Sequence, residues 1–207
     1  MGSCCEKKAC EIETLKEKHA SVLKIVLVIN ALMFFVELIS GLRANSLALL
    51  GDSLDMFGDA AVYGLSLYTL SRIHLRANVT IIKGIIMVLG AAAVICGVMV
   101  RIWTGVVPAF ETMSWIGTLA LAANAICFLM LYRFKADDIN MKSVWLCSRN
   151  DLIANAAVIL AAGLVWYFNS AVPDLIVGGA IAALFFQSSI EVLRDGFGER
   201  GRHSAQN

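Results

Sequence analysis

Long apolar stretches separated by short polar breaks run along most of the chain. Six of them are long enough to cross about 30 Å of hydrocarbon as helices that rise about 1.5 Å per residue. They lie near residues 22–42, 47–71, 79–103, 114–133, 143–168 and 173–194. Their apolar positions follow the period of a helix, about 3.6 residues, rather than the alternation of a strand. The pattern therefore predicts an all-α, polytopic membrane protein with six transmembrane helices.

Turn-forming residues mark the predicted helix ends. Asn45 and Ser46 are expected to cap the second helix, and Pro173 with Asp174 to open the sixth. The chain then divides into three parts. These are an N-terminal tail over residues 1–20, a six-helix transmembrane domain over 21–196 and a short C-terminal tail over 197–207.

Composition supports the membrane assignment. Of the 207 residues, 59% are hydrophobic and 16% are charged, and the mean hydropathy is +0.76. Soluble domains are about half apolar and about a quarter charged. The net charge of +1 gives no basic surface of the kind that binds nucleic acid.

Basic residues are unevenly distributed among the polar breaks. They precede the first helix, fall in the second and fourth breaks and follow the sixth helix, whereas only Arg43 and Arg101 border the opposite side. The positive-inside rule therefore predicts that both termini are cytoplasmic. We expect a multi-pass protein of the bacterial inner (plasma) membrane, with the lipid bilayer as its surroundings.

Acidic residues inside two predicted helices are the strongest functional signal. The second helix carries Asp52, Asp55 and Asp59, whose spacing of three and four residues places them on one helical face. The fifth helix carries Cys147 and Asp151, again four residues apart. A charged, unpaired carboxylate in the membrane costs a few kcal/mol, about 2.5–3.5 on insertion scales, so such clusters are functional candidates.

Asp55, Asp59, Cys147 and Asp151 could converge as four metal ligands. Four ligands suit a tetrahedral ion such as Zn²⁺, and a thiolate among them favours borderline or soft metals. The structural alternatives are that a single aspartate bonds to a neighbouring helix, that Asp52 caps its helix or shapes an entrance, and that Cys147 is a small packing residue.

Further polar residues are weaker candidates. Glu37, seven residues after Asn30 on the same face of the first helix, could line the pathway, whereas Asn30 is expected to bond between helices. Asn124 and Asn155 are expected to support the ligands or join helices. A second weak signal lies in the N-terminal tail, where Cys4, Cys5 and Cys10 could collect metal ions. The alternative is a disordered tail in which these cysteines are incidental.

The stretches NSLALLGDSLDMFGDAAVYGLSLY and LCSRNDLIAN resemble the second and fifth helices of the cation diffusion facilitator family, the proton-coupled zinc transporters. The resemblance covers about residues 20–196. It implies metal export in exchange for protons, with Asp55 and Asp59 as the second-helix pair and Asp151 as the fifth-helix aspartate. Asn155 also recurs in relatives. The family further suggests a homodimer, although no residue pattern here specifies the contact.

Two departures from the family pattern stand out. Cys147 occupies the position where most relatives have histidine, which favours Cd²⁺ while still permitting Zn²⁺. The chain also ends at Asn207, so the resemblance is to a short member without the cytoplasmic α/β domain that most relatives carry.

The predicted ligands also predict a coupling chemistry. Metal ions bind deprotonated carboxylates and thiolates, so the empty, buried site is expected to hold protons that the metal displaces. This describes a transporter rather than an enzyme, with Zn²⁺ or Cd²⁺ and protons as substrates and no cofactor. Two alternatives are a non-transporting metal sensor or partner-binding subunit, which would bind without flux, and a proton-coupled carrier of organic cations.

Overall fold

The computed structural model describes the backbone of residues 4–68, 76–132 and 139–204. Within these ranges, side chains are described for residues 21–22, 24–61, 64, 80–132, 151–194 and 196–198. The described backbone forms six helices and confirms the predicted all-α fold. They are α1 (Cys4–Ala44), α2 (Leu47–Tyr68), α3 (Arg76–Thr104), α4 (Phe110–Tyr132), α5 (Ile139–Phe168) and α6 (Val172–Ser204).

Five of these helices contain segments long and apolar enough to cross a membrane, judged by length and composition over the described residues. They are Lys24–Ala44, Thr80–Thr104, Phe110–Tyr132, Asp151–Phe168 and Val172–Gly198. Helix α2 has 22 residues, which is also enough to span about 30 Å, but it carries three aspartates.

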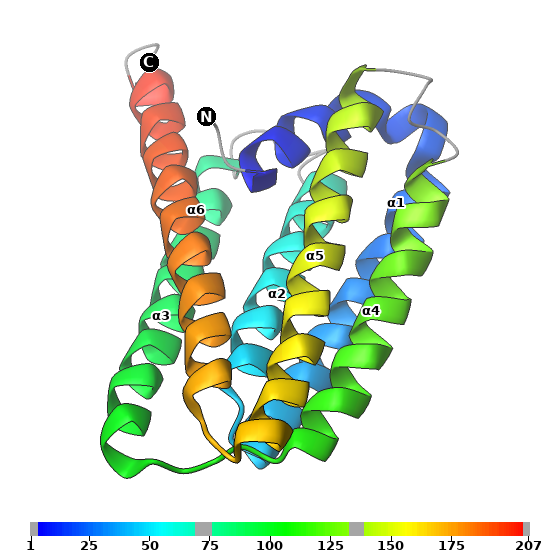
Figure 1. Cartoon of the computed structure of the whole chain (residues 1–207). Coiled ribbons are helices and arrows are strands. Elements are labelled where there is room, and N and C mark those ends of the chain that lie inside the picture. Colours follow the sequence, from blue (N-terminus) through cyan, green and yellow to red (C-terminus); the bar gives the residue numbers. More distant parts are fainter. Residues whose placement is uncertain (1–3, 69–75, 133–138, 205–207) are drawn as a thin grey trace.

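Two helices extend about ten residues or more beyond the predicted spans, and α3, α4 and α5 begin three or four residues before theirs. The backbone of α1 is already helical at Cys4, inside the predicted N-terminal tail, and α6 continues to Ser204. In Figure 1 the first turns of α1 run across the upper end of the bundle before the helix descends. Helix α1 begins and α6 ends at this same end, as an even number of crossings requires.

Many large apolar side chains are exposed and several polar ones are buried, unlike in a typical soluble bundle. In α1 the residues Val28, Leu32 and Phe35 are 54%, 62% and 57% exposed. On the opposite face, Asn30 and Glu37 are only 2% and 0% exposed. An apolar outer surface is stable against lipid, so α1 has one face toward the bilayer and its polar face toward the other helices.

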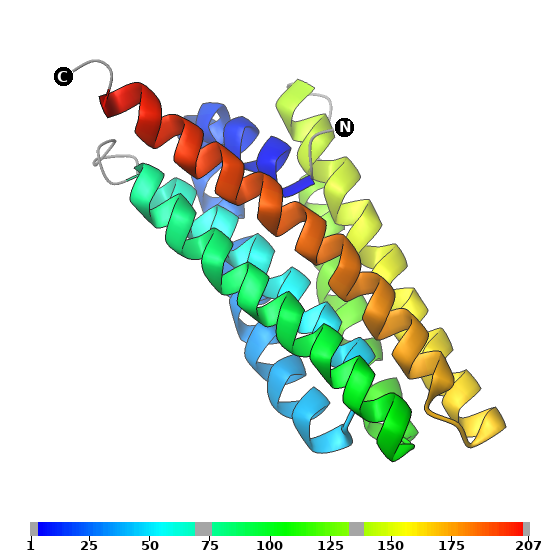
Figure 2. The same ribbon diagram turned by 90° about the vertical axis from the view of Figure 1, so that its left-hand side faces the viewer.

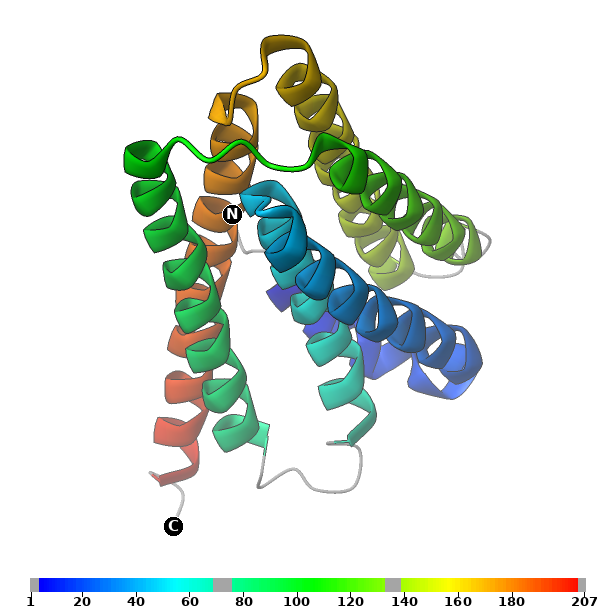
Figure 3. The same ribbon diagram turned by 90° about the horizontal axis from the view of Figure 1, so that it is seen from below.

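Helix α2 occupies the centre of the arrangement. The closest pairs are α1 with α2, α3 with α6 and α4 with α5, and α2 also packs against α3, α5 and α6. Seen from below, α2 lies between the α3–α6 pair and the group formed by α1, α4 and α5 (Figure 3). Figure 2 shows α3 and α6 side by side in front of α2. The helix with three aspartates is therefore shielded by its neighbours.

The connection between α1 and α2 corrects one prediction. Asn45 does not cap α2 but ends α1 in the left-handed region, with φ of 54°. The Ser46 N–H donates to Gly41 O over 2.9 Å and the Asn45 N–H to Leu42 O over 3.4 Å, the two bonds of a Schellman ending. Ser46 is the cap of α2, as predicted, because its Oγ accepts a bond from the Leu49 N–H at 3.1 Å.

Candidate functional site

A hydrogen bond between α2 and α5 fixes the centre of the candidate site. The amide of Asn155 donates to Asp52 Oδ1 over 3.1 Å, and both side chains are 0% exposed. The same amide also donates to the backbone oxygen of Asp151, one turn away in α5, at 3.0 Å. Asp52 therefore does not cap α2 or shape an open entrance; it bonds to a neighbouring helix inside the bundle.

The two helices run antiparallel, and this sets the register of the other predicted residues. Ala48, Val158 and Ala161 belong to one apolar cluster, while Asp52 bonds to Asn155. As residue numbers increase along α2, the residue numbers of the neighbouring positions in α5 therefore decrease. One turn beyond the Asp52–Asn155 bond, Asp55 and Asp151 are at the same level, each half-buried. Asp59, only 5% exposed, lies one turn further.

The backbone of Cys147 is about two turns beyond Asn155 in α5, so the register brings it level with Asp59. The side chain of Cys147 lies outside the described residues, as do those of Cys4, Cys5 and Cys10. Among the side chains that are described, no three of histidine, cysteine, aspartate or glutamate are close enough to hold one metal ion. The predicted set of four ligands thus stays a prediction.

Glu37 brings a third helix into the cluster. Its carboxylate is 0% exposed and lies within electrostatic reach of Asp52 and Asp55, and Asp52 lies within reach of Asp151. Neither carboxylate oxygen of Glu37 has a hydrogen-bond partner. The sequence placed Glu37 and Asn30 on one face, and both are buried. The Asn30 amide, however, donates within its own helix, to Val26 O at 2.9 Å, rather than between helices.

Asn124 of α4 is buried at the level of Asp151. Gly117 of α4 packs against Val158 and Ile159 of α5. Because α4 and α5 are antiparallel neighbours, seven residues along α4 and seven back along α5 lead to Asn124 and Asp151. Asn124 is 3% exposed, and its Nδ2 has no hydrogen-bond partner. A buried amide donor therefore lies at the level of the carboxylate cluster.

An apolar cluster closes one end of the site. It consists of Ala48, Leu49, Met113, Val158, Ala161 and Ala162. Its α2 and α5 members lie about one to two turns from Asp52 and Asn155, toward the α1–α2 and α5–α6 connections. An ion at the carboxylates cannot pass this dry packing unless the helices move.

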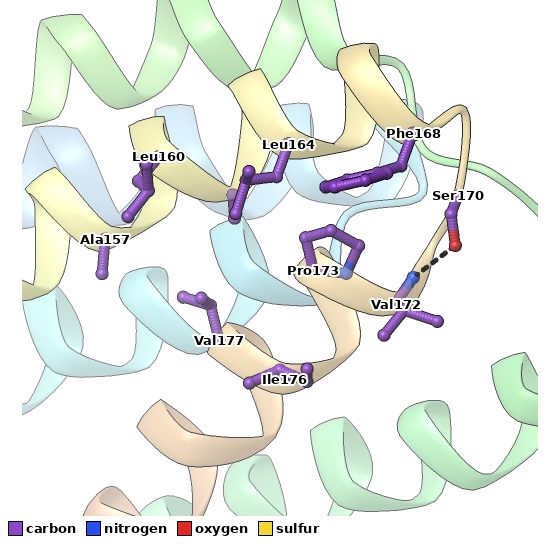
Figure 4. Close-up of a pocket in the computed structure, with 10 residues that line it drawn as sticks. Ala157, Leu160, Leu164, Phe168, Ser170, Val172, Pro173, Ile176 and Val177 are labelled. Carbon is purple, nitrogen blue, oxygen red and sulfur yellow. Dashed lines mark hydrogen bonds between the residues drawn. The ribbon is translucent and has the colours of Figure 1, made fainter.

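A separate hollow of about 490 Å³ lies between α5 and α6 near their connection. Its ten lining residues are apolar apart from Ser170, whose Oγ accepts a bond from the Val172 N–H at 3.3 Å (Figure 4). Leu160, Phe168 and Ile176 on its walls are 64%, 61% and 65% exposed. A lining of this kind suits lipid chains and offers no ligand for a cation.

One residue that positions α2 was not assigned its role from the sequence. Asp174 was expected only to open α6. Its buried carboxylate instead accepts bonds from the Ser46 hydroxyl and from the N–H groups of Leu47 and Ala48, at 2.6, 2.8 and 3.0 Å. The acidic residue after a proline was the available signal, but its partner is over a hundred positions away in the sequence.

The fold and this site define a class: an integral, multi-pass α-helical membrane protein with a buried carboxylate cluster on its central helix. Comparison with known families is more specific. Residues 23–199 match the cation efflux transmembrane domain. The match covers most of the chain, so the protein belongs to the cation efflux family, which confirms the resemblance noted above.

Three curated relatives carry the name zinc transporter ZitB. The protein from Pectobacterium atrosepticum is 24% identical over 83% of this chain and 58% of its own length. Those from Yersinia pestis and Yersinia pseudotuberculosis are 24% and 23% identical over 89% of this chain and 64% of their own length. The chain thus spans about three fifths of the length of these relatives.

Proposed function

We propose that this protein is a divalent metal efflux transporter that exchanges cytoplasmic Zn²⁺ or Cd²⁺ for protons. Membership of the cation efflux family supports the class of function. The observation that carries the proposal is the Asp52–Asn155 bond, because it joins the two helices that hold the predicted ligands inside the bundle. Names of relatives that mention zinc support the choice of metal.

The proposed transport site consists of Asp55, Asp59, Cys147 and Asp151. The antiparallel register supports this set, since it brings Asp55 level with Asp151 and Asp59 level with the Cys147 backbone. With the metal absent, protons on these groups offset the cost of burying several like charges. Metal binding releases those protons, which couples the two fluxes.

The proposed membrane is the bacterial inner membrane, with both termini cytoplasmic. In that orientation the apolar cluster closes the site on the side opposite the cytoplasm. Ions then reach the carboxylates from the cytoplasmic end. Transport then requires the cluster to separate, as alternating access demands. The lipid bilayer, metal ions and protons are the proposed partners, and the function is transport rather than catalysis.

Flux into proteoliposomes tests the proposal. Vesicles containing the purified protein are prepared with an interior more acidic than the bath, and the uptake of Zn²⁺ and Cd²⁺ is measured with and without this gradient. We expect uptake that depends on the gradient in the wild type and at most background uptake in Asp151→Asn. Glu111→Gln, which removes an exposed carboxylate at the start of α4, is the matched control and should behave as wild type.

Three other outcomes separate the alternatives. Metal binding without flux, in wild-type protein that is folded and correctly inserted, would make this a metal sensor or partner-binding subunit. Wild-type flux in Asp151→Asn would remove Asp151 from the site. Gradient-driven uptake of an organic cation in place of metal would favour the carrier of organic cations.

A further inference from the structure

Two carboxylates and one amide in the bundle interior share an unusual feature. Glu37, Asp52 and Asn155, from three different helices, are each 0% exposed. Both oxygens of Glu37, Oδ2 of Asp52 and Oδ1 of Asn155 have no hydrogen-bond partner. Buried polar atoms in folded proteins are nearly always paired. Four unpaired acceptor oxygens therefore indicate a ligand that the protein itself does not provide.

These oxygens belong to neighbouring groups. Asp52 and Asn155 are joined by the 3.1 Å bond, and Glu37 is within electrostatic reach of Asp52. The connection at Asn45 and Ser46 makes α1 and α2 an antiparallel pair. Glu37 lies before that turn, and Asp52 and Asp55 lie after it at similar separations along the chain. In an antiparallel pair, this places the three carboxylates at about the same level.

The chemistry of the unpaired atoms limits what the ligand can be. All four are acceptors, and two of the three groups carry negative charge when ionised, so the group favours a positively charged ligand over an anion. Carboxylate and amide oxygens are the ligand types of hard divalent cations, whereas a thiolate selects softer metals. The group therefore differs in preference from a site that contains Cys147.

We propose that Glu37, Asp52 and Asn155 form a second cation position that binds a divalent ion through oxygen atoms alone. It lies about one helical turn deeper in the bundle than Asp55 and Asp151, beside the apolar cluster. The proposal concerns binding and does not depend on transport. If the proposed transport function also holds, this position is the last binding position that an ion from the cytoplasm reaches before the apolar cluster.

Co²⁺ binding tests the second position because Co²⁺ reports its own ligands. Bound to thiolate it gives an intense sulfur-to-metal charge-transfer absorption, whereas Co²⁺ bound only to oxygen atoms absorbs weakly. The purified full-length protein is equilibrated with Co²⁺ in lipid nanodiscs, and bound metal per protein is measured together with the absorption spectrum. The variants are Glu37→Gln, Asp52→Asn and Cys147→Ser, with Glu111→Gln as the control for loss of an exposed carboxylate.

We expect Glu37→Gln and Asp52→Asn each to lower the affinity for the same oxygen-bound Co²⁺ ion by at least about tenfold. The charge-transfer absorption should be unchanged in both variants. Cys147→Ser should remove that absorption and leave the oxygen-bound ion in place. The wild type could bind only one Co²⁺ ion, with that binding lost in Glu37→Gln and kept in Cys147→Ser. This result would support the second position and would contradict the site that contains Cys147.

The proposal is overturned if Glu37→Gln binds as much Co²⁺ as wild type with the same affinity, or if the ion it loses is the one with thiolate absorption. Circular dichroism and a monodisperse elution profile establish that each variant is folded. Should Glu37→Gln fail this criterion, Asp52→Asn tests the same ion from a different helix.

Discussion

The hydroxyl of Ser46 donates to Asp174 Oδ1 over 2.6 Å and joins the first turn of α2 to the first turn of α6. The N–H groups of Leu47 and Ala48 donate to the same carboxylate at 2.8 and 3.0 Å. These groups at the start of a helix lack partners within it, and the positive end of the helix dipole favours an anion there. An acidic residue of α6 thus anchors the helix that carries Asp52, Asp55 and Asp59.

Replacing Asp174 should therefore destabilise the fold. Asp174→Ala leaves three buried donors without their acceptor, and each unpaired donor costs about 1–3 kcal/mol when it cannot reach water. We expect a lower melting temperature in detergent, with Asp174→Asn intermediate because its amide oxygen still accepts. Glu111→Ala, an exposed carboxylate in the first turn of α4, should change stability by less than about 0.5 kcal/mol. Equal melting temperatures for Asp174→Ala and the control would contradict this role.

A close backbone contact reinforces the same anchor. A Cβ added to Gly178 of α6 would lie 2.5 Å from the carbonyl carbon of Leu47 and 2.7 Å from the Ala48 nitrogen. Backbone atoms cannot yield as a flexible side chain can, so Gly178→Ala must push α6 away from α2. We expect it to lower the melting temperature clearly and to reduce metal uptake.

Gly163→Ala is the matched control for this substitution, because an added Cβ there meets nothing within 4 Å. Within α5, five residues before its end, this change should be neutral or stabilising by up to about 1 kcal/mol, since alanine favours helix over glycine. If both substitutions had the same effect on melting, close approach at Gly178 would not explain the result.

The sequence was sufficient for the helices but not for the contacts that position them. Apolar stretches predicted the six helices, and the spacing of Asn30 and Glu37 placed both on one face, which is buried in the structure. The role of Asp174 could not be predicted, because a carboxylate at a helix start looks the same whether it caps its own helix or another. Asn45 was misassigned for a similar reason: asparagine favours both helix caps and the left-handed ending that it adopts here.

The identity of residue 147 should set metal preference if the proposed ligand set is correct. Cys147→His replaces a soft thiolate by an imidazole that still binds Zn²⁺ well. We expect transport to persist while the ratio of Cd²⁺ to Zn²⁺ uptake falls, measured by competition in proteoliposomes. Cys96→Ser, at an exposed position of α3, is the control and should keep the wild-type ratio. An unchanged ratio in Cys147→His would remove Cys147 from direct contact with the ion.

The proposed orientation predicts which helix connections are reached from outside the cell. Val106, between α3 and α4, is 44% exposed, and Gly198 near the end of α6 is also exposed. In a background without native cysteines, Val106→Cys should react with a membrane-impermeant maleimide in intact cells. Gly198→Cys should react only after the cells are opened. The opposite labelling pattern would place the termini outside.

The buried carboxylate of Glu37 should lower the stability of the metal-free protein while it contributes to binding a divalent ion. A buried carboxylate without partners is costly, so replacing it with an apolar side chain of similar size should help folding. We expect Glu37→Met to raise the melting temperature of the metal-free protein, by about 1–3 kcal/mol in stability. Wild-type protein should gain stability when Co²⁺ is added, since a ligand that binds the folded state stabilises it. Glu37→Met should gain less. A variant that is less stable than wild type without metal and gains as much with it would show that Glu37 serves packing alone.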